Sequence, residues 1–326
     1  MKVGIVGATG EVGRAMIKVL EEMDIPVSKL RLFASKRSAG KTLEFKGKEY
    51  VVEELREDHM RERYDYILFS AGVEVSKKFA PIAAKIGNTV IDNSSAFRLV
   101  RGIPLVVPEI NGHLLKGYRG IVANPNCSTI QMVLSLYKVH RVYGIKEIVV
   151  STYQAVSGAG HKGVVELQSQ MDGEDIVSVF PKRILGNVIP LIGPIKENLC
   201  TQEEMKMVNE TRKILNDPSI MVYPTAVRVP VFYGHSESIF VKLVKPFKSL
   251  EELKIVLSSS EDVVVTDDIV TPLDIEGSDL TYICRVRAFD NTSFSFWNVA
   301  DNIRVGAATN AVRILKKHME LNGVRS

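Results

Sequence analysis

The fold is decided by one stretch near the N-terminus, Lys2-Val3-Gly4-Ile5-Val6-Gly7-Ala8-Thr9-Gly10-Glu11-Val12-Gly13. Residues 2–6 are mostly apolar and predict a buried strand, and a helix is expected over about 14–23. A glycine-rich turn between such a strand and helix lets a pyrophosphate approach the backbone amides at the helix N-terminus. A plain strand–helix connection is the alternative, but the place of the turn at the start of a βαβ unit favours a dinucleotide site.

The end of the second predicted strand, Lys29–Ser35, bears on the choice of dinucleotide. Sites for the unphosphorylated cofactor usually have an acid here, which binds the ribose 2′-hydroxyl. This strand instead runs into Ser35-Lys36-Arg37-Ser38-Ala39-Gly40, which has two cations and no acid. Cations and hydroxyls suit a 2′-phosphate, so the sequence predicts NADP, with a solvated basic surface loop as the alternative.

Further segments indicate the architecture. Strands predicted at Tyr66–Ser70 and Thr89–Asp92, with a helix at about Val75–Ile86 between them, are typical of a doubly wound parallel sheet. In the second half, strand-like runs predict a mostly antiparallel sheet with flanking helices; they are Ile148–Val156, Ser238–Leu243 and Leu280–Arg287.

The predicted fold class is therefore α/β, with a Rossmann-like parallel-sheet domain and an α+β domain that has a mostly antiparallel sheet. We expect the first domain to comprise residues 1–125 and 303–326 and the second to comprise 126–302. The first is expected to be discontinuous because the amphipathic helix predicted over Ile303–Met319 should return to it.

Cys127 is the strongest candidate for a reactive group. It follows a buried strand, Gly120–Ala123, and precedes a run with helical apolar spacing, Ile130–Tyr137. Asn126 is a good helix N-cap, which places the thiol in the first helical turn. The helix N-terminus favours thiolate over thiol there, whereas a small buried hydrophobe is the alternative for an isolated cysteine.

Other segments offer partners for this thiol. His235 is a candidate general acid or base, although a lone histidine is more often structural. Arg228 could hold a carboxylate through two parallel hydrogen bonds. Glu203 and Lys206 lie three residues apart on a helix predicted over Gln202–Leu215, where a surface ion pair is the simplest interpretation.

Composition excludes several classes of function. The chain has 326 residues, 45% hydrophobic content and a net charge of +4 with no long basic run, so nucleic acid is not an expected partner. Three widely spaced cysteines predict neither a disulfide framework nor a metal site and fit a reducing cytoplasm. Neither a signal peptide nor a membrane span is expected.

Taken together, these motifs resemble the aspartate-semialdehyde dehydrogenase family from the glycine turn to the terminal helix. The most specific matches are Asn124-Pro125-Asn126-Cys127-Ser128-Thr129, Gln154-Ala155-Val156-Ser157-Gly158-Ala159-Gly160, and Arg228-Val229-Pro230 with His235-Ser236-Glu237. The resemblance implies a cytoplasmic homodimer with an NADP domain and a catalytic and dimerisation domain. It also implies the reversible, NADPH-dependent reduction of L-4-aspartyl phosphate to L-aspartate 4-semialdehyde and phosphate. This step serves lysine, diaminopimelate, threonine, methionine and isoleucine biosynthesis.

The resemblance also implies roles for individual residues. Cys127 would form a thioester and His235 would be the acid or base. Substrate and phosphate would be bound by Arg98, Gln154, Glu203, Lys206 and Arg228. NADP would contact Thr9, Gly10, Glu11, Val12, Ser35, Arg37, Ser38, Ser157, Gly158 and Asn302.

Three alternatives remain at this stage. N-acetyl-gamma-glutamyl-phosphate reductase has the same chemistry, but its acylated substrate has no ammonium for Glu203 to meet. Glyceraldehyde-phosphate dehydrogenase shares the thiol chemistry, but the predicted 2′-phosphate site disfavours an NAD enzyme. A non-catalytic NADP-binding paralogue is disfavoured because both Cys127 and His235 are present.

Overall fold

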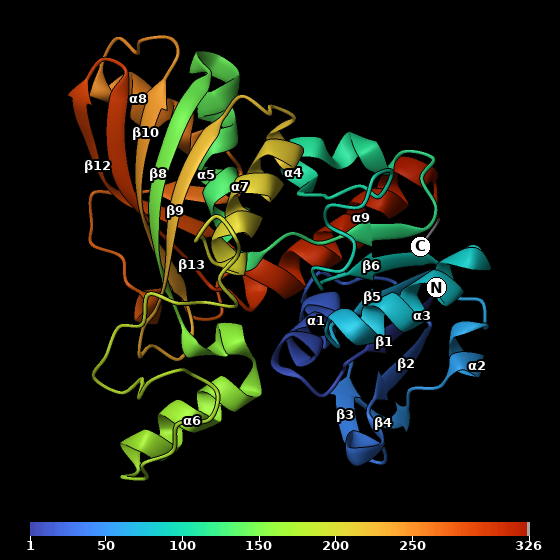
Figure 1. Ribbon diagram of the computed structural model, residues 1–326. Coiled ribbons are helices and arrows are strands. Elements are labelled where there is room, and N and C mark those ends of the chain that lie inside the picture. The colour runs from blue at the N-terminus through green and yellow to red at the C-terminus, as the bar shows by residue number, and fades with distance from the viewer. Residues whose placement is uncertain (325–326) are drawn as a thin grey trace. The chain divides into compact units, whose positions relative to one another are not determined.

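The computed structural model describes residues 1–324, which form two compact units (Figure 1). One unit comprises Met1–Pro125 and the segment that starts at Ala307, and the other comprises Asn126–Gly306. Each unit is built around its own sheet, as the two-part sequence pattern predicts.

The first unit contains a seven-stranded sheet in the order β3-β4-β2-β1-β5-β6-β7. All neighbouring strands are parallel except β3 and β4. The strands are β1 (Lys2–Val6), β2 (Lys29–Ala34), β3 (Thr42–Phe45), β4 (Lys48–Glu54), β5 (Tyr66–Phe69), β6 (Thr89–Asp92) and β7 (Ile121–Ala123). The helices are α1 (Glu11–Glu22), α2 (Glu57–Met60), α3 (Val73–Lys85), α4 (Pro108–Asn111) and α9 (Asn310–Asn322).

Helices cover both faces of this sheet because its strands are apolar on both sides. Val3 and Ile5 of β1 pack in one cluster with residues of α1 and α9. Val6, Phe33 and Phe69 pack in another with residues of α3. This is the doubly wound arrangement predicted from the sequence.

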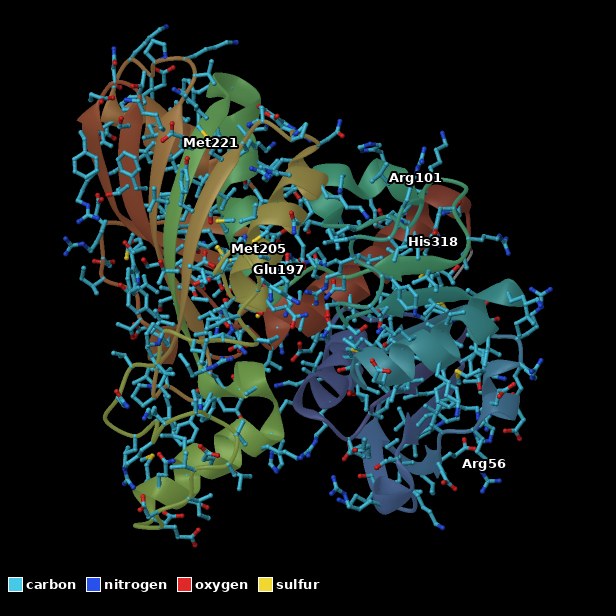
Figure 2. All side chains as sticks on the ribbon, viewed as in Figure 1. Arg56, Arg101, Glu197, Met205, Met221 and His318 are labelled. Atoms are coloured by element: carbon cyan, nitrogen blue, oxygen red, sulfur yellow. The ribbon has the colours of Figure 1, made fainter. Side chains whose placement is uncertain are left out.

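Helix α9 is tied to this sheet by His318, which Figure 2 labels. The Tyr66 hydroxyl and His318 Nδ1 are 2.8 Å apart, and His318 Nε2 lies 2.8 Å from the carbonyl oxygen of Tyr118. Burial lowers the pKa of His318, so the ring is held as a neutral hydrogen-bonding group.

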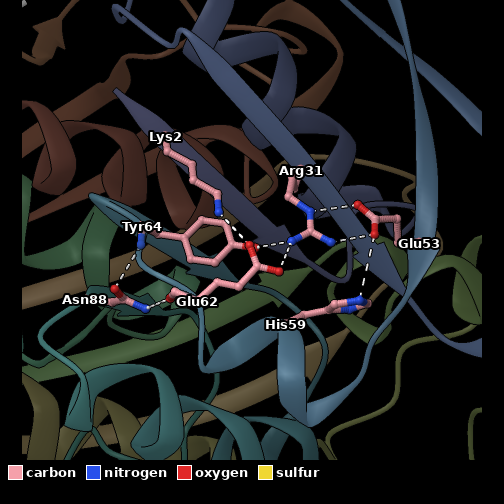
Figure 3. Close-up of polar contacts among 7 residues, drawn as sticks. All are labelled: Lys2, Arg31, Glu53, His59, Glu62, Tyr64 and Asn88. Carbon is pink, nitrogen blue, oxygen red and sulfur yellow. Dashed lines mark hydrogen bonds and ion pairs between the residues drawn. The ribbon is translucent and has the colours of Figure 1, made fainter.

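A network of charged side chains joins β2 to its neighbours at the other side of the sheet (Figure 3). The Arg31 guanidinium donates to both carboxylate oxygens of Glu53, at 2.8 and 2.6 Å, and to Glu62 and the Tyr64 hydroxyl. Lys2 donates to the other oxygen of Glu62 at 2.7 Å. Burial alone would raise the pKa of Glu62, but these two cations outweigh it and lower the pKa to about 2.

The second unit contains a six-stranded sheet in the order β11-β12-β13-β10-β8-β9. The three central pairings are antiparallel and the two outer ones are parallel. The strands are β8 (Ile145–Gln154), β9 (Met221–Arg228), β10 (His235–Leu243), β11 (Val263–Val265), β12 (Thr281–Asp290) and β13 (Ser293–Ala300). The helices are α5 (Cys127–Tyr143), α6 (His161–Met171), α7 (Gln202–Leu215) and α8 (Leu250–Ser258).

Two helices differ from the sequence-based expectation. Helix α1 starts at Glu11 rather than near residue 14, since Glu11 is an acid in the first turn, where the helix dipole favours it. The single helix expected over Ile303–Met319 is instead a π-helical turn, Arg304–Thr309, followed by α9. The π turn contains Gly306, where an added Cβ would lie 2.6 Å from the Cβ of Cys127. The absence of a side chain at Gly306 thus allows the backbone of this turn to lie against the candidate nucleophile.

Candidate active site

The glycine turn of the first unit is a compact backbone cradle. Gly7 has φ +86°, and a Cβ there would collide with the backbone oxygen of Ser70. A Cβ at Gly13 would collide with the carbonyl oxygen of Gly7. Gly10 is the N-cap of α1 and has no side chain with which to cap it. The N-terminus of α1 is therefore not capped by the side chain of its N-cap residue, and the turn fits a bound pyrophosphate.

The predicted 2′-phosphate segment lies just beyond the end of β2. Ser35 is the N-cap of a short 3₁₀ turn, Lys36–Ser38. Ser35 and Arg37 are exposed. Within residues 1–324 the Arg37 guanidinium has no ion-pair or hydrogen-bond partner. An unpaired, exposed guanidinium at this strand end fits the extra phosphate of NADP.

Arg98 is positioned within the first unit by backbone oxygens. It is buried, and it donates from Nε to the carbonyl of Asn124 and from Nη2 to that of Asn93, at 2.9 Å each. Asn93 follows β6 and Asn124 follows β7, so the side chain is fixed at the carboxyl ends of two parallel strands. This is the edge where ligands of such sheets bind.

Cys127 is the first residue of α5, as the sequence predicts. Asn126 caps the helix by accepting a hydrogen bond from the Thr129 amide at 3.2 Å. The Asn126 amide donates to Glu210 at 2.6 Å, and its side-chain nitrogen donates to Glu203 at 2.7 Å. Two carboxylates of α7 therefore position the start of α5, which carries the candidate nucleophile.

Three predicted site residues lie at neighbouring strand ends in the second unit. Gln154 ends β8, Arg228 ends β9, and the two are paired in the parallel ladder. His235 begins β10, whose next residue pairs with Tyr153 of β8. The Arg228 guanidinium is buried, and its Nη1 donates to the carbonyl of Ala155 at 2.6 Å. Burial lowers the pKa of Arg228, and the nearby Glu203 and Cys127 side chains act against this shift.

The surroundings of His235 fix the state of its ring. Nδ1 accepts the backbone amide of Ala155 at 3.0 Å, so the neutral ring has its proton on Nε2. Complete burial and the nearby Arg228 cation lower the pKa of His235 to about 3. At neutral pH the ring is therefore uncharged and offers one hydrogen-bond donor, Nε2–H.

Glu203 and Lys206 form an ion pair on one face of α7, with 2.7 Å between Oε2 and Nζ; Glu203 is buried and Lys206 is half-buried. The other oxygen of Glu203 also accepts from Gln154 at 3.4 Å. Burial alone would raise the pKa of Glu203, but Lys206, Asn126 and Arg228 outweigh it and lower the pKa to about 2. The carboxylate is thus ionised and links α7 to β8.

Ser157, Gly158 and Asn302 belong to the second unit, unlike the other predicted NADP contacts. Asn302 donates to the Ser157 hydroxyl at 3.0 Å and accepts the Gly234 amide at 2.8 Å. A Cβ on Gly158 would lie 2.7 Å from Nη1 of Arg228 and 3.2 Å from Nε2 of His235. The absence of a side chain at Gly158 therefore keeps the space beside both groups open.

A cavity of about 390 Å³ adjoins this group of residues. Arg228 lines it together with apolar side chains that include Phe180 and Leu191. A buried cation in a mostly apolar cavity is suited to a small anionic ligand.

Across residues 1–324, none of the helices has the length and apolar character needed to cross a membrane. The same residues contain no cluster of three His, Cys, Asp or Glu side chains arranged to hold a metal ion.

Comparison with known proteins identifies the family. Residues 2–118 match the model of the semialdehyde dehydrogenase NAD binding domain, and residues 136–305 match that of the semialdehyde dehydrogenase dimerisation domain. Aspartate-semialdehyde dehydrogenase from Aquifex aeolicus is 49% identical over 96% of each chain. The chain belongs to the aspartate-semialdehyde dehydrogenase family. The Bacillus subtilis member is 42% identical, over 99% of this chain and 98% of its own.

Solved structures agree with this membership. The structure of aspartate semialdehyde dehydrogenase II complexed with ASA from Vibrio cholerae has a TM-score of 0.94 and 45% identity, covering 98% of each chain. These findings confirm the predicted family, the α/β fold and the enzyme class, an NADP-dependent dehydrogenase of amino-acid biosynthesis. These findings favour an aspartate-semialdehyde dehydrogenase over the alternative, N-acetyl-gamma-glutamyl-phosphate reductase.

Several residues that shape this site were not predicted from the sequence. Glu210 holds the Asn126 amide, Gln131 of α5 donates to the carbonyl of His235, and Gly306 lies against Cys127. Gly306 lies four residues after the predicted NADP contact Asn302, and this proximity in the sequence could have indicated it. The other two act through partners far away in the chain.

Proposed function

We propose that this protein catalyses the reversible, NADPH-dependent reduction of L-4-aspartyl phosphate to L-aspartate 4-semialdehyde and phosphate. The observation that carries the proposal is the group at the strand ends of the second unit. There Gln154, Arg228 and His235 lie side by side at neighbouring strand ends, and Cys127 is near enough to influence the pKa of Arg228. A nucleophile, a carboxylate-binding cation and a neutral hydrogen-bond donor are the groups that this acyl transfer needs.

The first step is the attack of the Cys127 thiolate on the acyl carbon of aspartyl phosphate. The C–S bond forms, the acyl C–O bond breaks, and phosphate leaves with its electron pair, which yields a thioester. Arg228 would bind the substrate carboxylate, and Glu203 would accept hydrogen bonds from its ammonium. Arg98 and Lys206 would bind the phosphate, since separate cations reduce the repulsion between two anions.

The second step would reduce the thioester, with a hydride that NADPH would supply when bound. His235 Nε2–H would donate to the oxygen on which negative charge develops, and Gln154 would orient the same carbonyl. As the oxyanion re-forms the C=O bond, the C–S bond breaks, the Cys127 thiolate leaves with the bonding electron pair, and the aldehyde is released as product. The sequence predicts a general acid or base at His235; we propose that the ring acts in this step by hydrogen-bond donation from Nε2, because it is neutral.

The two units would have different functions, cofactor binding in the first and catalysis in the second. We propose that residues 1–125 and the C-terminal helix bind NADP through Thr9, Gly10, Glu11, Val12, Ser35, Arg37 and Ser38. The second unit would supply catalysis, dimerisation and the contacts of Ser157, Gly158 and Asn302. The match to a dimerisation domain supports a homodimer acting on small molecules. A biosynthetic role in the cytoplasm fits the three free cysteines, Cys127, Cys200 and Cys284.

The test is a kinetic comparison of two aldehydes with two cofactors in the presence of phosphate. We expect aspartate semialdehyde with NADP⁺ to give the highest kcat/KM of the four combinations. A preference for N-acetyl-glutamate semialdehyde would overturn the substrate assignment, and a preference for NAD⁺ would overturn the role of Arg37. Absence of turnover with all four would favour the non-catalytic paralogue.

A further inference from the structure

Glu237 is a buried acid that the reaction above does not use. It lies on β10 two residues after His235, and its exposed fraction is 0%. In the β-sheet it pairs with Asn298 of β13 on one side and Thr152 of β8 on the other. Its neighbour on the helix side is Gln131 of α5, one turn after Cys127.

Two buried side-chain oxygens in this region, one on Glu237 and one on Gln131, have no hydrogen-bond partner within residues 1–324. Oε2 of Glu237 accepts from Asn298 at 3.0 Å, whereas Oε1 has no partner within residues 1–324. Gln131 donates its amide nitrogen to the carbonyl of His235 at 3.3 Å, and its own Oε1 has no partner there either. An ionised carboxylate offers only acceptors, so it cannot satisfy the Gln131 oxygen.

Among residues 1–324, no charged side chain compensates for burying this carboxyl. The side chains that act on the Glu237 carboxyl are Gln131 and Asn298, both neutral amides. The nearest titratable side chains along the adjoining elements are Cys127 on α5, Tyr153 on β8 and His235 on β10 itself, and β13 has none. None of these is among the groups that act on the carboxyl. A buried ion without a countercharge is strongly unfavourable.

We propose that Glu237 is a neutral carboxylic acid whose O–H donates to Gln131 and thereby positions His235 against the nucleophile helix. The proton on Oε1 satisfies both unpartnered oxygens at once. Gln131 in turn holds the backbone carbonyl of His235, so the ring is fixed relative to α5, which begins with Cys127. Glu237 is therefore a positioning residue, and its effect on catalysis rests on the function proposed above.

Two other buried acids of the same unit show the contrast. Glu203 faces Lys206, and Glu166 accepts the backbone amides of Ser178 and Val179 at 2.9 and 2.5 Å. The pKa of each is lowered, because these partners outweigh burial. For Glu237 burial dominates and raises the pKa well above its ordinary value.

The test compares melting temperatures of wild type and Glu237→Gln between pH 5 and pH 8. The unfolded carboxyl ionises near pH 4.5, whereas the folded one stays protonated to a higher pH. Wild-type stability therefore falls as pH rises through this window, and the glutamine variant lacks that loss. We expect the melting temperature of the variant, relative to that of wild type, to increase by about 5 °C or more from pH 5 to pH 8.

Glu166→Gln is the matched control, because Glu166 is equally buried but ionised across this window. The melting temperature of Glu166→Gln should be lower than that of wild type by the same amount at pH 5 and at pH 8. Infrared difference spectra should also show a protonated-carboxyl band in wild type that disappears in Glu237→Gln. The neutral assignment would be overturned if the melting temperature of Glu237→Gln relative to wild type stayed constant or decreased as pH rises. Absence of the infrared band in wild type would overturn it as well.

The positioning role is tested by kinetics. Glu237→Gln keeps a donor toward Gln131 and should keep kcat close to wild type, whereas Glu237→Ala should lower kcat by roughly 10- to 100-fold. Equal activity of both variants would overturn the positioning role. The melting and infrared tests need no turnover, so they can fail while the proposed function stands. Conversely, lack of activity toward aspartyl phosphate would leave the charge assignment intact.

Discussion

Replacing Asn126 with alanine tests whether α7 and the N-cap together support the start of α5. The Asn126 side chain makes two kinds of contact. Its oxygen accepts the Thr129 amide at 3.2 Å, and its nitrogen donates to the buried carboxylate of Glu203 at 2.7 Å. Alanine removes both, while the backbone bond from residue 126 to Glu210 remains available.

The size of the effect follows from these two contacts. Loss of an N-cap costs about 1 kcal/mol. Loss of a hydrogen bond to a buried charged group costs about 2 kcal/mol. Together they predict a loss of about 3 kcal/mol, which corresponds to roughly 6–12 °C in melting temperature for a domain of this size class.

Asn126→Ser separates the two contributions, because a serine hydroxyl can cap the helix but cannot reach Glu203 as the amide does. The serine variant should therefore lose about 1 kcal/mol less than the alanine variant. Thermal denaturation of wild type and both variants at one protein concentration, without ligands, measures this order. Equal losses would show that the cap contributes nothing, and unchanged melting temperatures in both variants would refute the reasoning altogether.

Three further substitutions test the site itself. Cys127→Ala should abolish turnover and leave NADP binding near wild type by fluorescence titration; remaining turnover would contradict its role as nucleophile. Arg37→Glu should weaken NADP binding about tenfold or more without affecting NAD, because it replaces a charged hydrogen bond with repulsion; equal losses for both cofactors would count against the 2′-phosphate site. Gly158→Ala places a Cβ 2.7 Å from Arg228 and 3.1 Å from His235. It should lower kcat/KM by up to about 100-fold at an unchanged melting temperature, and normal kinetics would contradict the packing argument.

The elements that the sequence predicts well are those with strong local signals. Helix α7 was expected over Gln202–Leu215 and has those bounds, because Thr201 and Glu204 form a capping box at its start. The hairpin of β3 and β4 was not predicted. Its turn uses Lys46 and Gly47, both with positive φ, where Asn-Gly is the usual signal, and β4 has few apolar residues.

The residues of the candidate site likewise differ in whether their role depends on nearby or distant parts of the chain. The sequence predicts Cys127 at a helix start and the glycine turn after β1, because each of these features depends on neighbouring residues in the chain. Gln131 and Glu210 were not found, since they act on His235 and Asn126 from 104 and 84 residues away. A single sequence contains no local pattern that relates such pairs.

Charge state is the property that depends most on these distant partners. Glu203 can be predicted as ionised because Lys206 follows it at helical spacing, and the structure has that ion pair. Glu237 has an equally plain sequence context, yet its partner Asn298 is 61 residues away and uncharged. Two glutamates in one unit therefore have pKa values shifted in opposite directions. The donors and cations that face each oxygen decide the difference, so the role of a buried acid follows from its three-dimensional surroundings rather than from residue type.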